Sequence, residues 1–166
     1  MATFRKELLT WRSGWLAPLA VAAALAAVIG YSVYRKVTVV IPHSYAAWTT
    51  GDLLVEYLET HNDQWPRGWA DLRQARDSLV RKGRNLYWDF DKLPGVVKVD
   101  WNVEPMVLAR SAEEDGESGI RVVTQLDGSR LEAKWGTDTE PNRKVAGYLA
   151  HRYSSTNQAP IQGTPR

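Results

Sequence analysis

Residues 15–34, WLAPLAVAAALAAVIGYSVY, form an uncharged run in a chain of which 24% is Asp, Glu, Lys or Arg. An α-helix rises about 1.5 Å per residue, so 20 residues reach about 30 Å, the thickness of the hydrocarbon core of a bilayer. A run of this length without charges is typical of a transmembrane helix. We therefore expect residues 15–34 to cross a membrane once.

Basic residues flank this run on both sides. They are Arg5, Lys6 and Arg12 before it and Arg35 and Lys36 after it, with Glu7 as the one acid among them. Lys and Arg beside a span lie among anionic headgroups. The membrane therefore explains the basic excess, so we expect the lipid bilayer to be a partner and nucleic acid not to be one.

A cleavable signal peptide is the alternative interpretation, because residues 22–27 contain A-x-A-like triplets. Apolar character continues through Val33 to a stop at Arg35, which exceeds the core of a typical signal. We therefore expect an uncleaved, single-pass anchor in the cell membrane. Three Lys or Arg before the span against two after it favour an extracytoplasmic domain.

The remaining residues are numerous enough for one small domain with its own core. The expected organisation is a basic N-terminal segment (1–14), a transmembrane helix (15–34), a linker or edge strand (35–43), a small α+β domain (44–153) and a disordered tail (154–166). The β-branched residues at 37–41 followed by Pro42 favour an extended stalk or edge strand. The tail is polar and rich in Ser, Thr, Gln and Pro.

The domain contains a series of helix and strand patterns. Apolar residues at helical spacing predict helices from 44 or 49 to 61, from 65 to 83 and from 142 to 153, with a short helical turn at Pro105. Alternating residues predict strands at 97–103, 120–126 and 130–135, and Asp127-Gly128 predicts a hairpin turn. The predicted fold class is α+β, with two helices, a three-stranded antiparallel sheet and a C-terminal helix after the transmembrane helix.

Two stretches of the domain carry a resemblance. IPHSYAAWTTGDLLVEYLETHNDQWPRGWADL (41–72) and IRVVTQLDGSRLEAKWGTDTEPN (120–142) resemble an uncharacterised family of small, single-pass membrane-anchored proteins common in planctomycete-type bacteria. A helix, a WPxxWxDL turn and a strand ending in LDG recur in that family. The resemblance implies a bacterial membrane protein with no known activity, so it assigns no functional residue.

Residue types that usually carry chemistry are scattered. The chain has no cysteine, and His43, His61 and His151 are each alone in sequence, which does not fit a zinc site. Asp89 and Asp91 form a carboxylate pair, but a polar loop explains them. The acidic run 113–117 lacks the spacing of a calcium loop. We therefore predict no catalytic residue, no metal site and no cofactor.

The unit WPRGW, residues 65–69, is the one candidate binding surface. Trp65, Pro66 and Trp69 form a candidate docking patch for another protein, since aromatic residues are enriched at protein interfaces. A hydrophobic staple that fixes how one helix leads into the next is the structural alternative.

These observations favour a non-enzymatic anchored domain that binds or scaffolds another membrane or envelope protein. An enzyme of unidentified chemistry is one alternative, and it would need a deep pocket with shifted pKa values. A pseudopilin-like assembly subunit is another. That class carries a Glu five positions after a processed Gly, but Leu19 stands five positions after Gly14. A pilin would also have one helix running from the membrane into the head, which we expect residues 37–42 to interrupt.

Overall fold

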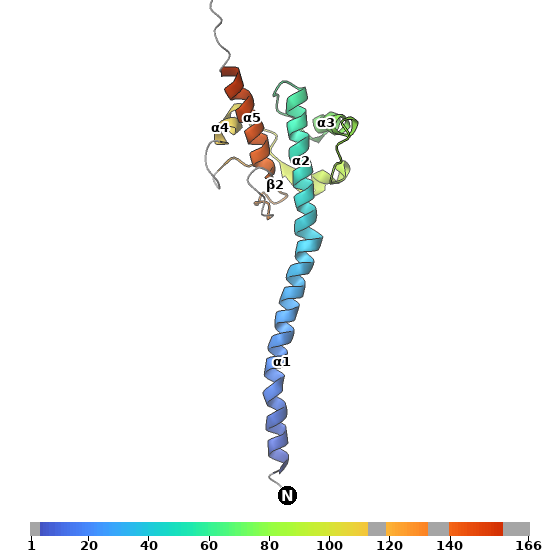
Figure 1. Cartoon of the computed structure of the whole chain (residues 1–166), viewed down its shortest axis with the longest axis vertical. Coiled ribbons are helices and arrows are strands. Elements are labelled where there is room, and N and C mark those ends of the chain that lie inside the picture. The colour runs from blue at the N-terminus through green and yellow to red at the C-terminus, as the bar shows by residue number, and fades with distance from the viewer. Residues whose placement is uncertain (1–3, 113–118, 133–139, 158–166) are drawn as a thin grey trace, which may run out of the picture. The chain divides into compact units, whose positions relative to one another are not determined.

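The computed structural model of the protein describes residues 4–112, 119–132 and 140–157. The chain divides into two compact units, Met1–Val40 and Ile41–Arg166. The first unit contains helix α1 (Phe4–Arg35) and a π-helical turn, η1 (Lys36–Val40) (Figure 1). Because α1 begins at Phe4, Pro18 lies inside the helix.

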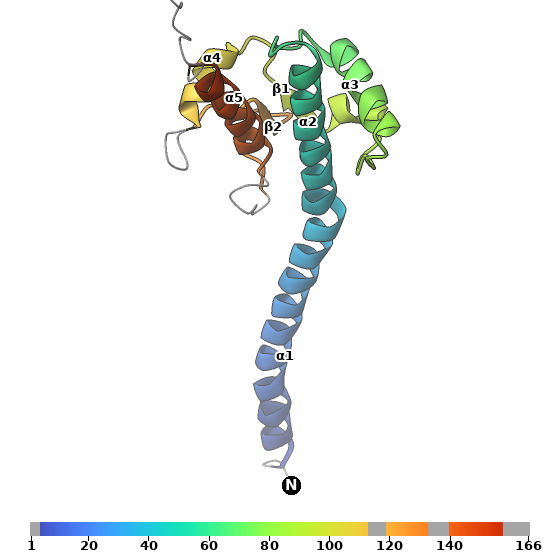
Figure 2. The same ribbon diagram turned by 45° about the horizontal axis from the view of Figure 1, so that its top comes forward.

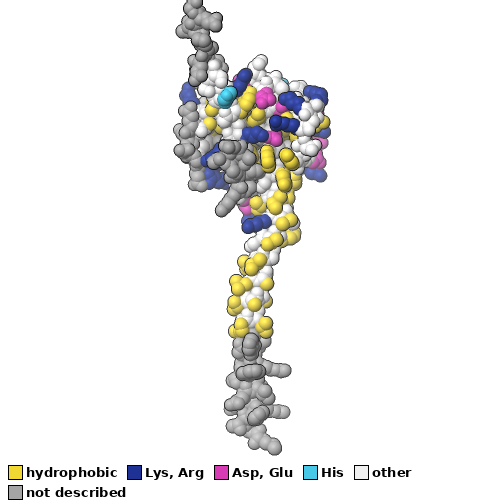
Figure 3. Space-filling model, viewed as in Figure 1, with side chains coloured by type: hydrophobic (Ala, Val, Ile, Leu, Met, Phe, Trp, Pro, Cys, Tyr) yellow, Lys and Arg dark blue, Asp and Glu magenta, His cyan; other side chains and the backbone are white. Residues whose placement is uncertain are grey.

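The side chains of residues 17–34 are all exposed, and hydrophobic side chains line this part of α1 (Figure 3). Exposing so many apolar side chains to water is unfavourable, whereas lipid is a good solvent for them. Among the described residues, one helix is long and apolar enough to cross a membrane, and it lies near the N-terminus.

The expected extended linker or edge strand over residues 35–43 was wrong. Lys36–Val40 form the π-helical turn, and α2 begins at Ile41. The hydroxyl of Thr38 donates to the carbonyl oxygen of Tyr34 at 2.8 Å, which ties this β-branched residue to the preceding turn. Pro42 has no backbone N–H to donate to a carbonyl of the preceding turn. Local helical hydrogen bonding therefore outweighed strand propensity.

Three helices frame the second unit: α2 (Ile41–Thr60), α3 (Trp69–Arg81) and α5 (Pro141–Asn157). In two views α2 lies between α3 and α5, and it contacts both (Figures 1 and 2). Leu53, Leu54 and Leu58 of α2 are completely buried because the helix has partners on two sides. Each such leucine contributes about 1.5–3 kcal/mol through burial of apolar surface.

Left-handed backbone conformations end the first two of these helices. Asn62 has a φ of 52° just after α2, and Gly83 has a φ of 73° just after α3. The N–H of Arg84 donates to the carbonyl of Leu79 at 3.0 Å, which closes the end of α3. The helix expected to open at Trp65 begins instead at Trp69, since residues 64–67 are irregular.

Within the residues that the structure describes, the sheet has two strands, β1 (Val97–Val99) and β2 (Val123–Gln125), which pair antiparallel with Lys98 opposite Thr124. The predicted third strand over 130–135 is not confirmed: residues 130–132 are not in a strand, and 133–135 lie outside the described residues. The Asp127-Gly128 turn is present, with Gly128 at φ 82°. The α+β class with a long apolar N-terminal helix is thus confirmed, but helices dominate the fold.

Two short helices complete the domain. The loop over 85–94 includes a 3₁₀-helix, η2 (Phe90–Gly95), and the predicted turn at Pro105 is α4 (Pro105–Ser111). One core joins all these elements. Its fully buried side chains include Leu72, Leu79, Leu93, Val97, Leu108, Val122, Val123, Val145 and Leu149. The predicted tail 154–166 starts too early, because α5 continues to Asn157; residues 158–166 lie outside the described part.

Candidate functional site

The candidate docking patch lies where the chain passes from α2 to α3. Pro66 is buried, whereas Trp65 and Trp69 are half-buried and pack against the core. The indole N–H of Trp65 donates to the carbonyl of Asp100 at 3.0 Å. A residue distant in sequence therefore fixes the position of the Trp65 ring. In this patch, part of each tryptophan side chain therefore packs against the core, and another part is exposed.

Edge-to-face packing holds Trp69 at the first position of α3. Its ring centre is 5.4 Å from that of Trp101 at an interplanar angle of 80°, and 6.3 Å from that of Phe90 at 82°. Such pairs contribute about 0.5–1.5 kcal/mol beyond buried area. The guanidinium groups of Arg73 and Arg76 lie 5.4 and 5.8 Å from the centre of the Phe90 ring. Two arginines of α3 thus make cation–π contacts with the Phe90 ring of this aromatic group.

Arg67 lies between the two tryptophans of the patch, and its side chain is 89% exposed. Its backbone N–H donates to Oδ2 of Asp71 at 2.9 Å, and its Nε donates to the same oxygen at 3.3 Å. The hydrogen bond from this N–H is the largest cause that lowers the pKa of Asp71. Asp71 therefore ties the first turn of α3 to a residue before the helix and rigidifies the turn that presents Arg67.

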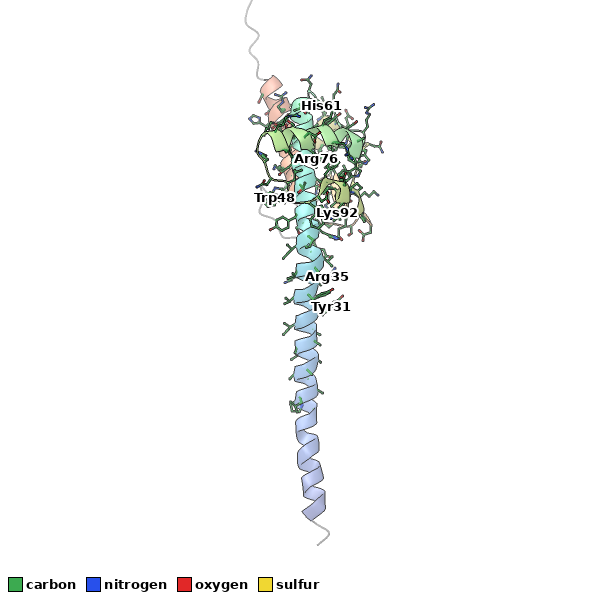
Figure 4. The ribbon with its side chains drawn as sticks, turned by 90° about the vertical axis from the view of Figure 1, so that its right-hand side faces the viewer. Tyr31, Arg35, Trp48, His61, Arg76 and Lys92 are labelled. Atoms are coloured by element: carbon green, nitrogen blue, oxygen red, sulfur yellow. The ribbon has the colours of Figure 1, made fainter. Side chains whose placement is uncertain are left out.

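The other residues considered for chemistry do not converge. His61 lies just past the end of α2 (Figure 4), where its ring stacks on Tyr57 at 3.9 Å. Asp89 accepts from the N–H of Asp91 at 3.2 Å, and Asp91 pairs with Arg73. Within the described ranges, no three His, Asp or Glu side chains are grouped closely enough to hold a metal ion. The acidic run 113–117 lies outside those ranges.

A polar cleft of about 80 Å³ lies along α2, and sequence reasoning missed it. Its lining residues are Asp52, Val55, Glu56, Glu59, Leu79, Lys82, Arg84 and Lys144. The three acids recur at helical spacing on α2, and this spacing was the available signal. Lys144 of α5 pairs with Asp52, and Lys82 pairs with Glu56 and lies 3.8 Å from Glu59.

Glu56 is the buried centre of this cleft, with only 4% of its side chain exposed. Oε1 accepts from the hydroxyl of Ser78 at 2.6 Å, and both carboxylate oxygens accept from Nζ of Lys82 at 2.7 Å. Burial by itself raises the pKa of Glu56. The hydrogen bonds from Lys82 and Ser78 and the charge of the lysine together lower this pKa by a larger amount, so the net shift is downward. A carboxylate held charged in this way is a structural anchor and a poor general acid.

A second polar group ties the end of α2 to α5. Asp63, at a φ of 60°, accepts from the hydroxyl of Tyr148 at 3.0 Å and from Nε of Arg152 at 3.3 Å. Burial, followed by the hydrogen bond to Asp63, raises the pKa of Tyr148 to about 12. These bonds satisfy the carboxylate and stabilise a backbone conformation that non-glycine residues seldom adopt.

Asn142 holds β2 against the start of α5. Its Oδ1 accepts from the N–H groups of Val122 and Val123 at 2.8 and 2.7 Å, and its Nδ2 donates to the carbonyl of Val123 at 3.1 Å. The side chain is 6% exposed. Asn142 therefore satisfies the hydrogen bonding of buried backbone groups beside a short strand. This role is structural.

Comparison with known proteins adds no relative to this picture. No family model, curated protein or solved structure matches the chain. The resemblance to the membrane-anchored family of planctomycete-type bacteria therefore stays a prediction.

Proposed function

We propose that the protein is a single-pass, membrane-anchored domain that binds or scaffolds another protein at the membrane and has no catalytic activity of its own. In this proposal residues 15–34 cross the bilayer, and the domain lies outside the cytoplasm. The candidate docking patch Trp65, Pro66 and Trp69 contacts the partner. The resemblance noted above fits this proposal, since it implies anchoring without a known activity.

The observation that carries the proposal is the rigid presentation of partly exposed tryptophans beside Arg67. Trp and Arg are the residue types most enriched at binding hot spots. The indole bond of Trp65 to Asp100 and the edge-on contacts of Trp69 fix both rings before any partner arrives. Fixed rings lose little conformational entropy on binding, so preorganisation increases affinity.

The polar cleft supports a binding role over a catalytic one. Pockets for small molecules are usually about 300–1,000 Å³, but this cleft holds about 80 Å³. Its buried carboxylate is paired with Lys82, and its pKa is lowered. A general acid or base that works near neutral pH needs a raised carboxylate pKa. We infer that the cleft holds α2, α3 and α5 together.

Site-specific photocrosslinking tests this proposal. Benzoylphenylalanine replaces Arg67 in the patch or, as the control, the exposed Arg110 of α4. Full-length protein is irradiated in its native membrane and then isolated in mild detergent. We expect one discrete adduct from position 67 and none from position 110. Equal adducts at both positions, or a complex without an adduct at position 67, would contradict docking at this patch.

A pseudopilin-like assembly subunit is the second candidate, because one specific observation favours it. Helical residues follow one another from Phe4 to Thr60, through the segment that we expected to interrupt the helix. Leu19 in place of the usual Glu argues against it, since that charge sets the register between subunits. The chain has no cysteine, so an Ala24→Cys variant tests assembly directly. Oxidation in membranes would give disulfide-linked copies for an assembled subunit and monomers for a simple anchor.

A further inference from the structure

An aromatic cluster joins the first half of α2 to the segment between α3 and η2. We define it as Tyr45, Trp48 and Tyr87. Tyr45 and Trp48 are three residues apart on α2 and so share one face. The ring of Tyr87 stacks on both, with centres 5.9 Å from Tyr45 and 5.4 Å from Trp48. Figure 4 labels Trp48 in this part of α2 and His61 just past the helix's other end.

Two of the three rings of the cluster belong to exposed residues. Tyr45 is 41% exposed and Tyr87 is 55% exposed, while Trp48 between them is half-buried. Grouped apolar side chains on a surface mark a contact with another apolar phase, whereas single ones need no explanation. Three stacked rings from two chain segments form such a group.

The covalent chain keeps this cluster close to a bilayer. Tyr45 is the tenth residue after Arg35, the charged residue that follows the apolar run. Ten helical residues span about 15 Å, and ten extended ones about 35 Å. Because this tether is short, the effective concentration of the membrane surface at the cluster is high. A freely diffusing protein partner does not have this advantage.

The side chains also match the headgroup layer chemically. Tyr and Trp are enriched at membrane interfaces, because the ring meets the acyl boundary while the hydroxyl or N–H bonds to headgroups. Arg84, three residues before Tyr87, is exposed, and Lys36 follows the span, so cations for lipid phosphates flank the cluster in sequence.

We propose that Tyr45, Trp48 and Tyr87 rest in the headgroup layer of the bilayer that holds residues 15–34. The contact orients the domain on the membrane, and α2 continues for about 18 Å past Trp48 before it ends at Thr60. This inference rests on the membrane anchoring in the proposed function, but it is independent of any protein partner.

Spin labels test the contact in the full-length chain. Because the chain has no cysteine, Asn85→Cys beside Tyr87 and Gln64→Cys beyond α2 each take a single nitroxide. Both positions are exposed. The protein is placed in vesicles of phosphatidylcholine and phosphatidylglycerol, and collisions with oxygen and with a water-soluble nickel chelate are compared. We expect a several-fold higher ratio of oxygen to nickel collisions at position 85 than at position 64.

A second variant separates this contact from anchoring. Tyr45→Ser combined with Tyr87→Ser should bring position 85 to the ratio of position 64 while the protein remains in the vesicle fraction. Loss of the protein from vesicles would instead contradict the anchoring itself. Equal ratios at positions 85 and 64 in the parent chain would overturn the inference. So would protection of position 85 from both reagents, since that result means a protein covers the cluster.

Discussion

The Nζ atom of Lys82 lies 2.7 Å from both carboxylate oxygens of Glu56, so one ion pair joins the end of α3 to the buried centre of α2. The pair is asymmetric, because Lys82 is 50% exposed and Glu56 is buried. Lys82→Met leaves a buried carboxylate without its cation and should destabilise the domain by about 3 kcal/mol. Glu56→Gln keeps an acceptor for Ser78 and should cost about 1 kcal/mol. Urea unfolding of the full chain in mild detergent, followed by tryptophan fluorescence, measures both values.

The same pair predicts a pH dependence. The pKa of Glu56 is lowered in the fold from an ordinary value of 4.5, so its stabilising effect is complete above about pH 4.5 and is lost as the pH falls through the lower folded pKa. In Lys82→Met the burial of Glu56 remains without the lysine and raises the pKa. The penalty of that variant should therefore shrink between pH 7 and pH 4. A penalty that does not vary with pH would contradict the ion pair.

Asn142→Ala should destabilise the domain by about 2–4 kcal/mol, because it leaves the N–H groups of Val122 and Val123 buried without an acceptor. Asn102→Ala is the control, since Asn102 is exposed, and its effect should stay within about 0.5 kcal/mol. Thermal melting by circular dichroism compares the two. Equal melting temperatures would show that Asn142 does not hold β2.

Tyr148→Phe should change stability mainly at alkaline pH. The folded pKa of Tyr148 is raised to about 12 from 10.0, so the contribution of this tyrosine is complete below pH 10 and is lost as the pH rises from 10 to 12. The variant loses one hydrogen bond to Asp63, which costs about 1 kcal/mol at neutral pH. Its unfolding free energy should then fall less steeply than that of the parent between pH 10 and 12. Identical alkaline slopes would refute the role of Tyr148.

Two glycines in helices should respond in opposite directions to alanine. A Cβ at Gly51 would lie 3.2 Å from Cα and Cβ of Pro141, so this backbone must shift by a few tenths of an ångström, and Gly51→Ala should cost about 1 kcal/mol. A Cβ at Gly147 meets nothing within 4 Å, so Gly147→Ala should stabilise α5 by about 0.5–1 kcal/mol. Melting temperatures decide the signs. Stabilisation by Gly51→Ala would contradict this prediction and would mean that the start of α5 yields to the added methyl group at little cost.

Local signals in the sequence were sufficient for much of the fold. Hydrophobic periodicity located three helices, and Asn62 and Gly83, whose residue types adopt left-handed conformations readily, stand just after two of them. Strand propensity misled over Lys36–Val40, where β-branched residues adopt a π-helical turn because the flanking segments are helical. The predicted strands were too long, since β1 and β2 have three residues each, and Asn142 satisfies the N–H groups of Val122 and Val123 where β2 begins.

The candidate site was only partly accessible to sequence reasoning. The WPRGW unit was recognisable from its aromatic residues, but the bond from Trp65 to Asp100 joins residues 35 positions apart. The ion pair of Lys82 with Glu56 likewise spans 26 positions. Long-range pairs of this kind depend on how α2 and α3 pack, and no local pattern specifies them.

The membrane anchor is the central claim, and carbonate extraction of cell membranes tests it most directly. Leu25→Arg places a charge in the middle of residues 15–34, which disfavours insertion by about 2.5–3.5 kcal/mol. Val80→Arg adds the same charge to an exposed position of α3 and serves as the control. We predict that the parent chain and Val80→Arg stay in the carbonate-resistant pellet while Leu25→Arg moves toward the soluble fraction. A parent chain found in the soluble fraction would contradict the account.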